Sequence, residues 1–327
     1  MEAMTGAIRW GLAGTGKIVN SFAEAFPAAG DGELVAVGSR AAETAEAFAT
    51  GHGIERAHAS YEALAADPDV DVVYVGGLHT VHAPQTAMFL EAGKHVLVEK
   101  PIALNASQVD RMIAAAEAND RFLMEAMWMR FNPAHVDVMA RIAAGKIGEV
   151  RRIRGDFSFA LPPDPTHRLL DRAKGGSGLL DLGIYPLTLA WWALGEPDTI
   201  DVVGHLADTG VDDEITLLCG WKGGAAATIT ASVRLPGGMD GRIEGTEGAI
   251  DLPLPMHATD TVTIRRGLES ETLTYEPPGL HHQVKEVHRC LRSGERESPR
   301  MPWATSRAMI ARFDELRARL GVVYDVD

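Results

Sequence analysis

A short apolar run that ends in two charged residues is the first place in this sequence where chemistry could occur. Val96-Leu97-Val98 has the β-branched character of a buried strand, and Glu99, Lys100 and Pro101 follow it directly. In open α/β sheets, the ligand site lies outside the carboxyl ends of the strands. A lysine ammonium in a low-dielectric site loses its proton more readily and can act as a base. Lys100 is therefore a candidate acid/base group, although Glu99 and Lys100 could equally form an ion pair that only stabilises the strand end.

A carboxylate and a phenol four residues apart form the second candidate. Asp181 and Tyr185 lie in an apolar segment over 179–194, and a helix there would place both on one face. Gly183 and Pro186 disfavour a regular helix at this point. A tyrosine beside a carboxylate and a lysine can move a proton to or from an alcohol oxygen. The alternative is a structural tyrosine, with a packed ring and a hydrogen-bonded hydroxyl.

A glycine-rich turn near the start of the chain indicates a dinucleotide site. A predicted strand over 8–13 runs into Gly14-Thr15-Gly16-Lys17-Ile18, and an amphipathic helix follows. Glycines in such a turn let backbone N–H groups approach a pyrophosphate at the positive end of the helix. Val19 replaces the third glycine of the usual fingerprint, which predicts slightly looser packing between the helix and the sheet.

The end of the next predicted strand, over 33–38, indicates which dinucleotide is bound. NAD sites usually carry a carboxylate here that binds the ribose hydroxyls. This chain has Ser39 and Arg40, a hydroxyl and a guanidinium that suit the additional ribose phosphate of NADP. The sequence therefore favours NADP over NAD, the alternative being that Arg40 is only an exposed residue before a helix.

Two histidines follow another predicted strand, over 71–77. His79 and His82 should reach the same edge of the sheet as the glycine turn, so we expect them to contact the cofactor or the substrate. A metal site is disfavoured because no third ligand lies nearby in the sequence.

The order of these elements predicts an α/β fold with two domains. Predicted strands over 8–13, 33–38, 57–59, 71–77, 96–98 and 122–126 alternate with helices, so residues 1–128 should form a doubly wound parallel sheet that binds a dinucleotide. Extended runs without intervening helices dominate after that, at 149–161, 200–205, 214–221, 225–233, 241–250, 261–265 and 271–275. Residues 129–327 should therefore form an α+β domain with a largely antiparallel open sheet. One face of that sheet could cover the substrate site and the other could pair with a second subunit.

Composition excludes several other classes of protein. The chain has 327 residues and a formal net charge of −14, which argues against binding to nucleic acid or to an anionic membrane. The longest apolar segment is too short to cross a bilayer. Cys219 and Cys290 show neither metal-ligand spacing nor a disulfide framework, so we expect a cytoplasmic protein.

Three motifs together resemble the Gfo/Idh/MocA oxidoreductases: Ala13-Gly14-Thr15-Gly16, Glu99-Lys100-Pro101 and Asp181-Leu182-Gly183-Ile184-Tyr185. The resemblance covers essentially the whole chain. Residues 122–128, 130–131, 209–213 and 297–299 are most similar to the branch of this family that contains dihydrodiol dehydrogenases and NADP-dependent D-xylose dehydrogenases. It implies a Rossmann domain, a second domain built on an open sheet that forms the subunit contact, and NADP as the hydride carrier.

The resemblance also implies roles for individual residues. Lys100 and Tyr185 would be the acid/base groups, and Asp181 would position substrate hydroxyls. We expect substrate contacts from Lys100, Trp128, Phe157, Asp181 and Tyr185. We expect cofactor contacts from Gly14, Thr15, Gly16, Lys17, Ile18, Ser39, Arg40, His79, His82, Glu99, Trp128 and Arg130.

The predicted activity is therefore hydride transfer between NADP and a hydroxyl-bearing carbon of a sugar, polyol or cyclic diol, in a homo-oligomer. Two alternatives use the same scaffold. One is an NAD-dependent glycoside hydrolase, in which a transient oxidation leaves the cofactor unchanged overall. The other is a cofactor-sensing binding protein without turnover, which would need neither Lys100 nor Tyr185.

Overall fold

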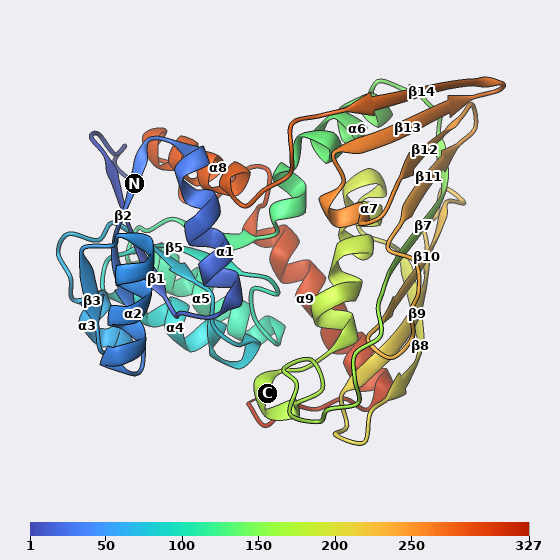
Figure 1. Cartoon of the computed structure of the whole chain (residues 1–327). Helices are drawn as coiled ribbons and strands as arrows, with labels where there is room; N and C mark the ends of the chain where they lie inside the picture. Colours follow the sequence, from blue (N-terminus) through green and yellow to red (C-terminus); the bar gives the residue numbers. More distant parts are fainter. Residues whose placement is uncertain (327) are drawn as a thin grey trace. The chain divides into compact units, whose positions relative to one another are not determined.

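The first sheet contains the six parallel strands that the alternation of apolar runs and helices predicts. In the computed structural model, which describes residues 1–326, the strand order is β3-β2-β1-β4-β5-β6, and every pairing is parallel. The order reverses between β1 and β4, which is where doubly wound sheets bind their ligands. Figure 1 shows these strands in blue to cyan among their connecting helices. The elements are β1 (Ile8–Ala13), α1 (Lys17–Ala25), η1 (Phe26–Ala29), β2 (Gly32–Gly38), α2 (Ala42–His52), β3 (Arg56–His58), α3 (Tyr61–Ala65), β4 (Val72–Val75), α4 (His79–Glu91), β5 (His95–Glu99), α5 (Ala106–Ala118) and β6 (Leu123–Ala126).

The register of this sheet aligns the carboxyl ends of its strands. Ala13 pairs with Gly38 on one side and with Val75 on the other, and Val75 in turn pairs with Val98. The residues that follow these strands therefore emerge at the same edge of the sheet. That edge is where the sequence placed the glycine turn, the Ser39-Arg40 pair and Lys100.

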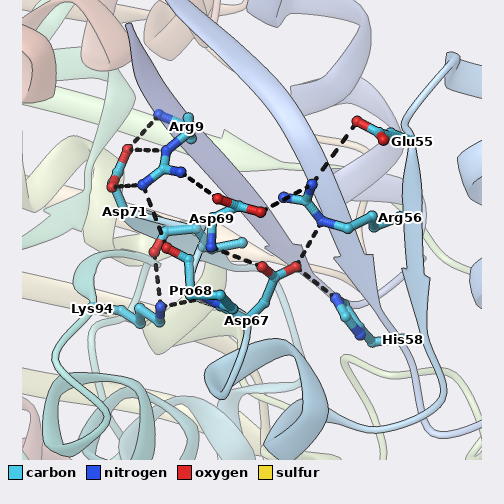
Figure 2. Close-up of polar contacts among 10 residues, drawn as sticks. Arg9, Glu55, Arg56, His58, Asp67, Pro68, Asp69, Asp71 and Lys94 are labelled. Carbon is cyan, nitrogen blue, oxygen red and sulfur yellow. Dashed lines mark hydrogen bonds and ion pairs between the residues drawn. The ribbon is translucent and has the colours of Figure 1, made fainter. Parts of the chain in front are cut away.

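A polar cluster lies near the amino-terminal ends of β1, β4 and β5 (Figure 2). Arg9 at the start of β1 binds both carboxylate oxygens of Asp71, with N···O distances of 3.0 and 2.8 Å. Lys94, just before β5, donates to the backbone oxygens of Asp67 and Val70. The Asp67 carboxylate is bound by Arg56 and His58. Burial acts to raise the pKa of Asp67, but the Asp69 N–H, His58 and Arg56 together keep that pKa below its usual value. The contacts of Arg9 and Lys94 join the starts of β1, β4 and β5, at the ends opposite the glycine turn.

The chain returns to the first unit after completing the second. The described residues divide into a unit of Met1–Trp128 with Gly279–Ala311, and a unit of Met129–Pro278 with residues 312–326. The sequence analysis assigned everything after residue 128 to the second domain, so the position of Gly279–Ala311 differs from that expectation. The physical reason is specific contacts: His288 on α8 (His281–Arg292) accepts a hydrogen bond from Trp10, and Ser306 on α9 (Trp303–Leu320) donates to Glu125.

The second unit is built on an eight-stranded sheet of order β14-β13-β12-β11-β7-β10-β9-β8. Its pairings are antiparallel except for β7 with β10, which is parallel. The run at 241–250, expected as one strand, folds as two, because the Gly245 N–H bonds to the Gly248 carbonyl and closes a turn. Figure 1 shows α6 and α7 on one side of this sheet. The elements are η2 (Trp128–Phe131), which begins in the first unit, α6 (Pro133–Ala143), β7 (Val150–Ser158), η3 (Arg172–Lys174), η4 (Leu179–Gly183), α7 (Ile184–Leu194), β8 (Thr199–Leu206), β9 (Asp212–Gly220), β10 (Ala226–Ser232), β11 (Gly241–Gly245), β12 (Ala249–Leu252), η5 (Met256–Ala258), β13 (Thr261–Arg266) and β14 (Glu269–Thr274).

Candidate active site

The glycine turn after β1 has the space and the backbone geometry that a pyrophosphate needs. Gly14 has φ +113°, a conformation that side chains disfavour, and its N–H donates to the Gly38 carbonyl at 2.9 Å. Gly16 is the N-cap of α1, and a Cβ added there would meet no atom within 4 Å. No side chain in residues 1–326 caps this helix start. Its N–H groups are therefore open to an anionic ligand.

Val19, which stands in place of the third glycine, packs closely rather than loosely. Its side chain is fully buried, and its Cγ2 atom would lie only 2.5 Å from a Cβ added to Gly76. The helix and the sheet therefore still approach closely. The glycine that permits this contact is Gly76, on the loop after β4, and not a glycine on α1. The expectation of looser packing was wrong for this reason.

The residues after β2 leave a cation available next to the turn. Ser39 is buried, its N–H donates to the His58 carbonyl at 3.1 Å, and its Oγ lies 2.7 Å from Thr44 Oγ1. Arg40 is exposed, as is Lys17 at the start of α1. Within the described chain, neither cation has a carboxylate at ion-pair distance. Both are therefore free to bind phosphate oxygens. The turn was also predicted to include Thr15 and Ile18. Thr15 is half-buried, and the side chain of Ile18 is 36% exposed.

The carboxylate of Glu99 is bound within the protein. Its Oε1 atom accepts a hydrogen bond from the Tyr74 hydroxyl at 2.6 Å, and Oε2 accepts from the backbone N–H of Lys100 at 3.2 Å. Tyr74 stacks on Phe22 of α1 with ring centroids 3.7 Å apart. These contacts fix the end of β5, where the half-buried side chain of Lys100 begins.

A second buried carboxylate, which the sequence analysis did not assign to the site, holds the segment after Lys100. Glu125 on β6 accepts from the Ile102 N–H at 2.9 Å and from the Ser306 hydroxyl at 2.6 Å. It stands in the sequence Met124-Glu125-Ala126, which carried part of the family resemblance. That motif was the only signal of its role.

His82 lies between two loops inside the first unit. It is fully buried, with Nδ1 2.8 Å from the Pro101 carbonyl and Nε2 3.2 Å from the Gly77 carbonyl. Burial lowers its pKa to about 3, and a positive charge on the neighbouring His79 would lower it further. This placement differs from the expected cofactor contact, because both ring nitrogens face protein carbonyls. His79 is also buried and its ring centroid lies 5.7 Å from that of His82.

The short helix η2 carries Trp128 and Arg130, both expected to contact the cofactor. Trp128 is half-buried and belongs to the first unit. Arg130 belongs to the second unit, where its guanidinium carbon lies 4.9 Å from the centroid of the Trp192 ring. Such cation–π contacts fix the orientation of a guanidinium.

Asp181 and Tyr185 lie on two consecutive helical turns of the second unit. Asp181 is in η4, a π-helical turn, and Tyr185 is in the first turn of α7. π-Helical turns are rare and frequent at functional sites. Asp181 is buried and pairs with Arg168, whose Nη2 and Nη1 atoms lie 3.0 and 3.3 Å from its oxygens. Arg168 lies in a loop without any periodic pattern, so nothing in the sequence connected it to Asp181.

Tyr185 is buried against an aromatic wall. Its ring centroid lies 5.5 Å from that of Phe157 on β7 and 4.9 Å from that of His257 in η5. Phe157 and His257 stack on each other with an interplanar angle of 18° and centroids 4.3 Å apart. Phe157 was expected here, whereas nothing in the sequence around His257 indicated its position. A carboxylate, a phenol and an apolar wall together can bind a polyol and remove a hydroxyl proton.

Metal clusters and membrane-spanning helices are both absent from the described residues. Among residues 1–326, no group of three or more His, Cys, Asp or Glu side chains is arranged to hold a metal ion. None of the helices in that part of the chain combines the length and the apolar character needed to cross a membrane.

Comparisons with known proteins agree with this arrangement. Residues 8–127 match an oxidoreductase family with an NAD-binding Rossmann fold, and residues 135–251 match the Gfo/Idh/MocA C-terminal domain. Trans-1,2-dihydrobenzene-1,2-diol dehydrogenase of Danio rerio is 37% identical over 98% of this chain and 99% of its own length. The human enzyme of that name is 34% identical over the same shares.

A solved structure shows the same architecture over almost the whole chain. The 3-ketoreductase KijD10 of Actinomadura kijaniata, in complex with NADP and TDP-benzene, has a TM-score of 0.85 and 27% identity, and the match covers 96% of this chain and 98% of that one. Both the sequence and the structure therefore lead to one conclusion. This chain belongs to the Gfo/Idh/MocA family of oxidoreductases, with an NAD-binding Rossmann fold in its first unit.

Proposed function

We propose that the chain is an NADP-dependent dehydrogenase that transfers a hydride between the nicotinamide and a hydroxyl-bearing carbon of a sugar or diol. The observation that carries the proposal is the turn that bears Asp181 and Tyr185, a buried carboxylate and phenol beside the wall of Phe157 and His257. Relatives that share 34–37% identity over the full chain are named as dehydrogenases of a cyclic diol, which supports this substrate class.

The residues of the first unit fit the cofactor. NADP, when bound, accepts or supplies the hydride. The open start of α1 suits the pyrophosphate, because Gly16 leaves space and the N–H groups there have no side-chain cap. Lys17, Ser39 and Arg40 would hold phosphate oxygens. His82 and Glu125 would fix the segment after Lys100, through Pro101 and Ile102, rather than touch the ligand.

Lys100 and Tyr185 are the proposed acid/base residues. We propose that Tyr185 takes the proton of the substrate hydroxyl during oxidation and returns it during reduction, with Lys100 supporting that transfer. Asp181 would accept hydrogen bonds from neighbouring substrate hydroxyls, and its ion pair with Arg168 fixes the position of its carboxylate.

A side-by-side screen with NADP and NAD tests the proposal. D-Xylose, D-glucose and cyclic trans-dihydrodiols should give substrate-dependent formation of NADPH, followed by the absorbance of the reduced nicotinamide. Release of free sugar from a nitrophenyl glycoside without net NADPH would favour a glycoside hydrolase instead. Cofactor binding without turnover of any member of the panel would favour a sensor.

Replacement of Arg40 by Ala tests the cofactor preference. We expect the KM for NADP to rise about 10- to 100-fold, because a charge-assisted contact to the ribose phosphate contributes roughly 1.5–3 kcal/mol. The KM for NAD, which lacks this phosphate, should change little. Arg111→Ala, at another exposed arginine of the same unit, is the matched control and should leave both values unchanged. Equal effects of Arg40→Ala on the two cofactors would contradict the proposal.

We also propose that two copies associate through the uncovered face of the eight-stranded sheet. Val203 on β8 and Leu218 on β9 are 70% and 57% exposed on the solvent side of that face. The two side chains lie on the same face of neighbouring strands, because Leu218 pairs with Asp201, two residues before Val203. Leu218→Lys should convert a dimer into monomers in light scattering, whereas Leu235→Lys, at an exposed loop residue, should not. A monomeric wild-type protein would refute this association.

A further inference from the structure

One motif of the sequence, Thr209-Gly210-Val211-Asp212-Asp213, has no role in the site described so far. Its Asp212 is the first residue of β9 and is fully buried. The Oδ1 atom accepts a hydrogen bond from the Ser177 hydroxyl at 2.7 Å, and Oδ2 accepts from the backbone N–H of Leu179 at 2.5 Å. The carboxylate therefore binds the segment that begins η4, although it lies more than 30 residues further along the chain.

Ser177 extends these contacts into the same turn. Its Oγ atom accepts from the Leu180 N–H at 2.9 Å, and its backbone carbonyl lies 3.3 Å from the N–H of Asp181. The Asp212 carboxylate and the Ser177 hydroxyl thus satisfy two consecutive N–H groups at the start of the π-helical turn, those of Leu179 and Leu180. These two groups precede the first backbone bond of the helix, so their pairing depends on the two side chains.

The surroundings leave the start of the turn little freedom. A Cβ added to Gly178 would lie 3.4 Å from the Asp212 carbonyl oxygen, and the Gly176 carbonyl accepts from the Tyr324 hydroxyl at 2.9 Å. Arg317 is buried, and its guanidinium lies over the Tyr324 ring. Its positive charge acts to lower the pKa of Asp212. Asp181 follows two residues after Leu179, and Tyr185 one turn later.

Ionisation of the buried Asp212 carboxyl lowers the free energy of unfolding. Burial raises its pKa to about 6, and the hydrogen bonds from Ser177 and Leu179 offset only part of that effect. Because the folded-state pKa exceeds the ordinary value of 3.8, stability falls as the pH rises from about 4 to about 6.

We propose that Asp212 and Ser177 are positioning residues that hold the turn of Asp181 and Tyr185 in its reactive geometry. The inference rests on the proposed function of those two side chains. Asp212 supplies acceptors to two donors at once, the Ser177 hydroxyl and the Leu179 N–H. An asparagine at this position offers one oxygen and one NH₂ group, so one of the two donors loses its acceptor.

Asp212→Asn and Ser177→Ala in the full-length protein test this proposal. We expect kcat to fall roughly 10- to 100-fold, because small displacements of reacting groups reduce rates on this scale. The KM for NADP should stay within about 2-fold, since the predicted cofactor contacts of the glycine turn lie in the first unit. The double variant should be no slower than the slower single variant, because both changes break one contact chain.

Asp213→Asn is the matched control. Its carboxylate lies 2.8 Å from His205 and 3.8 Å from Arg234, away from the turn, so kcat should remain unchanged. Hydrogen exchange of the Leu179 and Leu180 amides, which bond to the two side chains, supplies a readout independent of turnover. Exchange should rise in Asp212→Asn and Ser177→Ala but not in Asp213→Asn.

The outcomes separate this proposal from the one on which it rests. If Tyr185→Phe abolishes turnover while Asp212→Asn and Ser177→Ala keep at least a third of the wild-type kcat, the positioning role is refuted and the proposed function stands. An inactive wild-type protein refutes the proposed function, and the exchange measurement alone then decides whether the pair holds the turn. If Asp212→Asn does not fold, Ser177→Ala gives the result.

Discussion

Replacement of Lys100 by Met is expected to lower kcat at least 100-fold while NADP still binds. Lys100 follows β5 at the sheet edge where the Gly14–Gly16 turn also lies, and its backbone is fixed by Glu99. Methionine keeps an unbranched apolar stem of similar length but has no amine. General acid–base assistance contributes roughly 100- to 10,000-fold to a rate, so its loss should appear in kcat. Steady-state kinetics at saturating substrate, with calorimetric titration of NADP, measure the two effects separately.

Lys285→Met provides the comparison for this variant. Lys285 is an exposed lysine of α8 in the same unit, so the same change of side chain there should leave kcat and NADP affinity unaltered. A kcat for Lys100→Met within about 3-fold of wild type would remove Lys100 from the mechanism. A loss of NADP binding would instead assign it to the cofactor site.

The sheet edge that carries the predicted cofactor residues was predictable because its signals are local. Most of the six strands are apolar runs that end at a glycine or a polar residue, and parallel pairing then placed their carboxyl ends at one edge. Gly14, Gly16 and Arg40 follow directly from that logic. Side-chain direction is not a local property, however. His82 was expected at the ligand, but its ring turns inward to the carbonyls of Gly77 and Pro101.

The substrate half was less predictable because its contacts join distant segments. The spacing of Asp181 and Tyr185 indicated a shared helical segment, and Gly183 and Pro186 indicated irregularity, but neither specified a π-helical turn. Arg168 and His257 lie in segments without periodicity, so no pattern connected them to Asp181 or Tyr185. The parallel pairing of β7 with β10 likewise depends on long-range packing rather than on loop length.

Replacement of Tyr185 by Phe should reduce kcat roughly 100- to 10,000-fold, since it removes the hydroxyl proposed to exchange the substrate proton. The ring contacts with Phe157 and His257 are kept, so the free energy of unfolding should change by less than ~1 kcal/mol. KM for the substrate should change far less than kcat, because Asp181 remains to bind substrate hydroxyls. Thermal unfolding and steady-state kinetics on the same preparation measure both quantities.

Tyr275→Phe controls for the loss of a phenol in the second unit. The Tyr275 hydroxyl donates to Asp137 at 2.5 Å, so its removal also breaks a hydrogen bond but should leave kcat within about 2-fold. If Tyr185→Phe retained a third or more of the wild-type kcat, Tyr185 would be a structural tyrosine, the alternative that its buried ring also allows.

Combining the changes at Lys100 and Tyr185 tests whether the two groups act in one step. If Tyr185 transfers the proton and Lys100 only supports that transfer, removing the phenol leaves Lys100 nothing to support. The Lys100→Met/Tyr185→Phe variant should then be no slower than the slower single variant, as expected for residues that act as a unit. If the two groups instead stabilised the transition state independently, the fold-losses in kcat of the two single variants would multiply. A multiplicative result would preserve a role for each residue but would contradict a shared proton transfer.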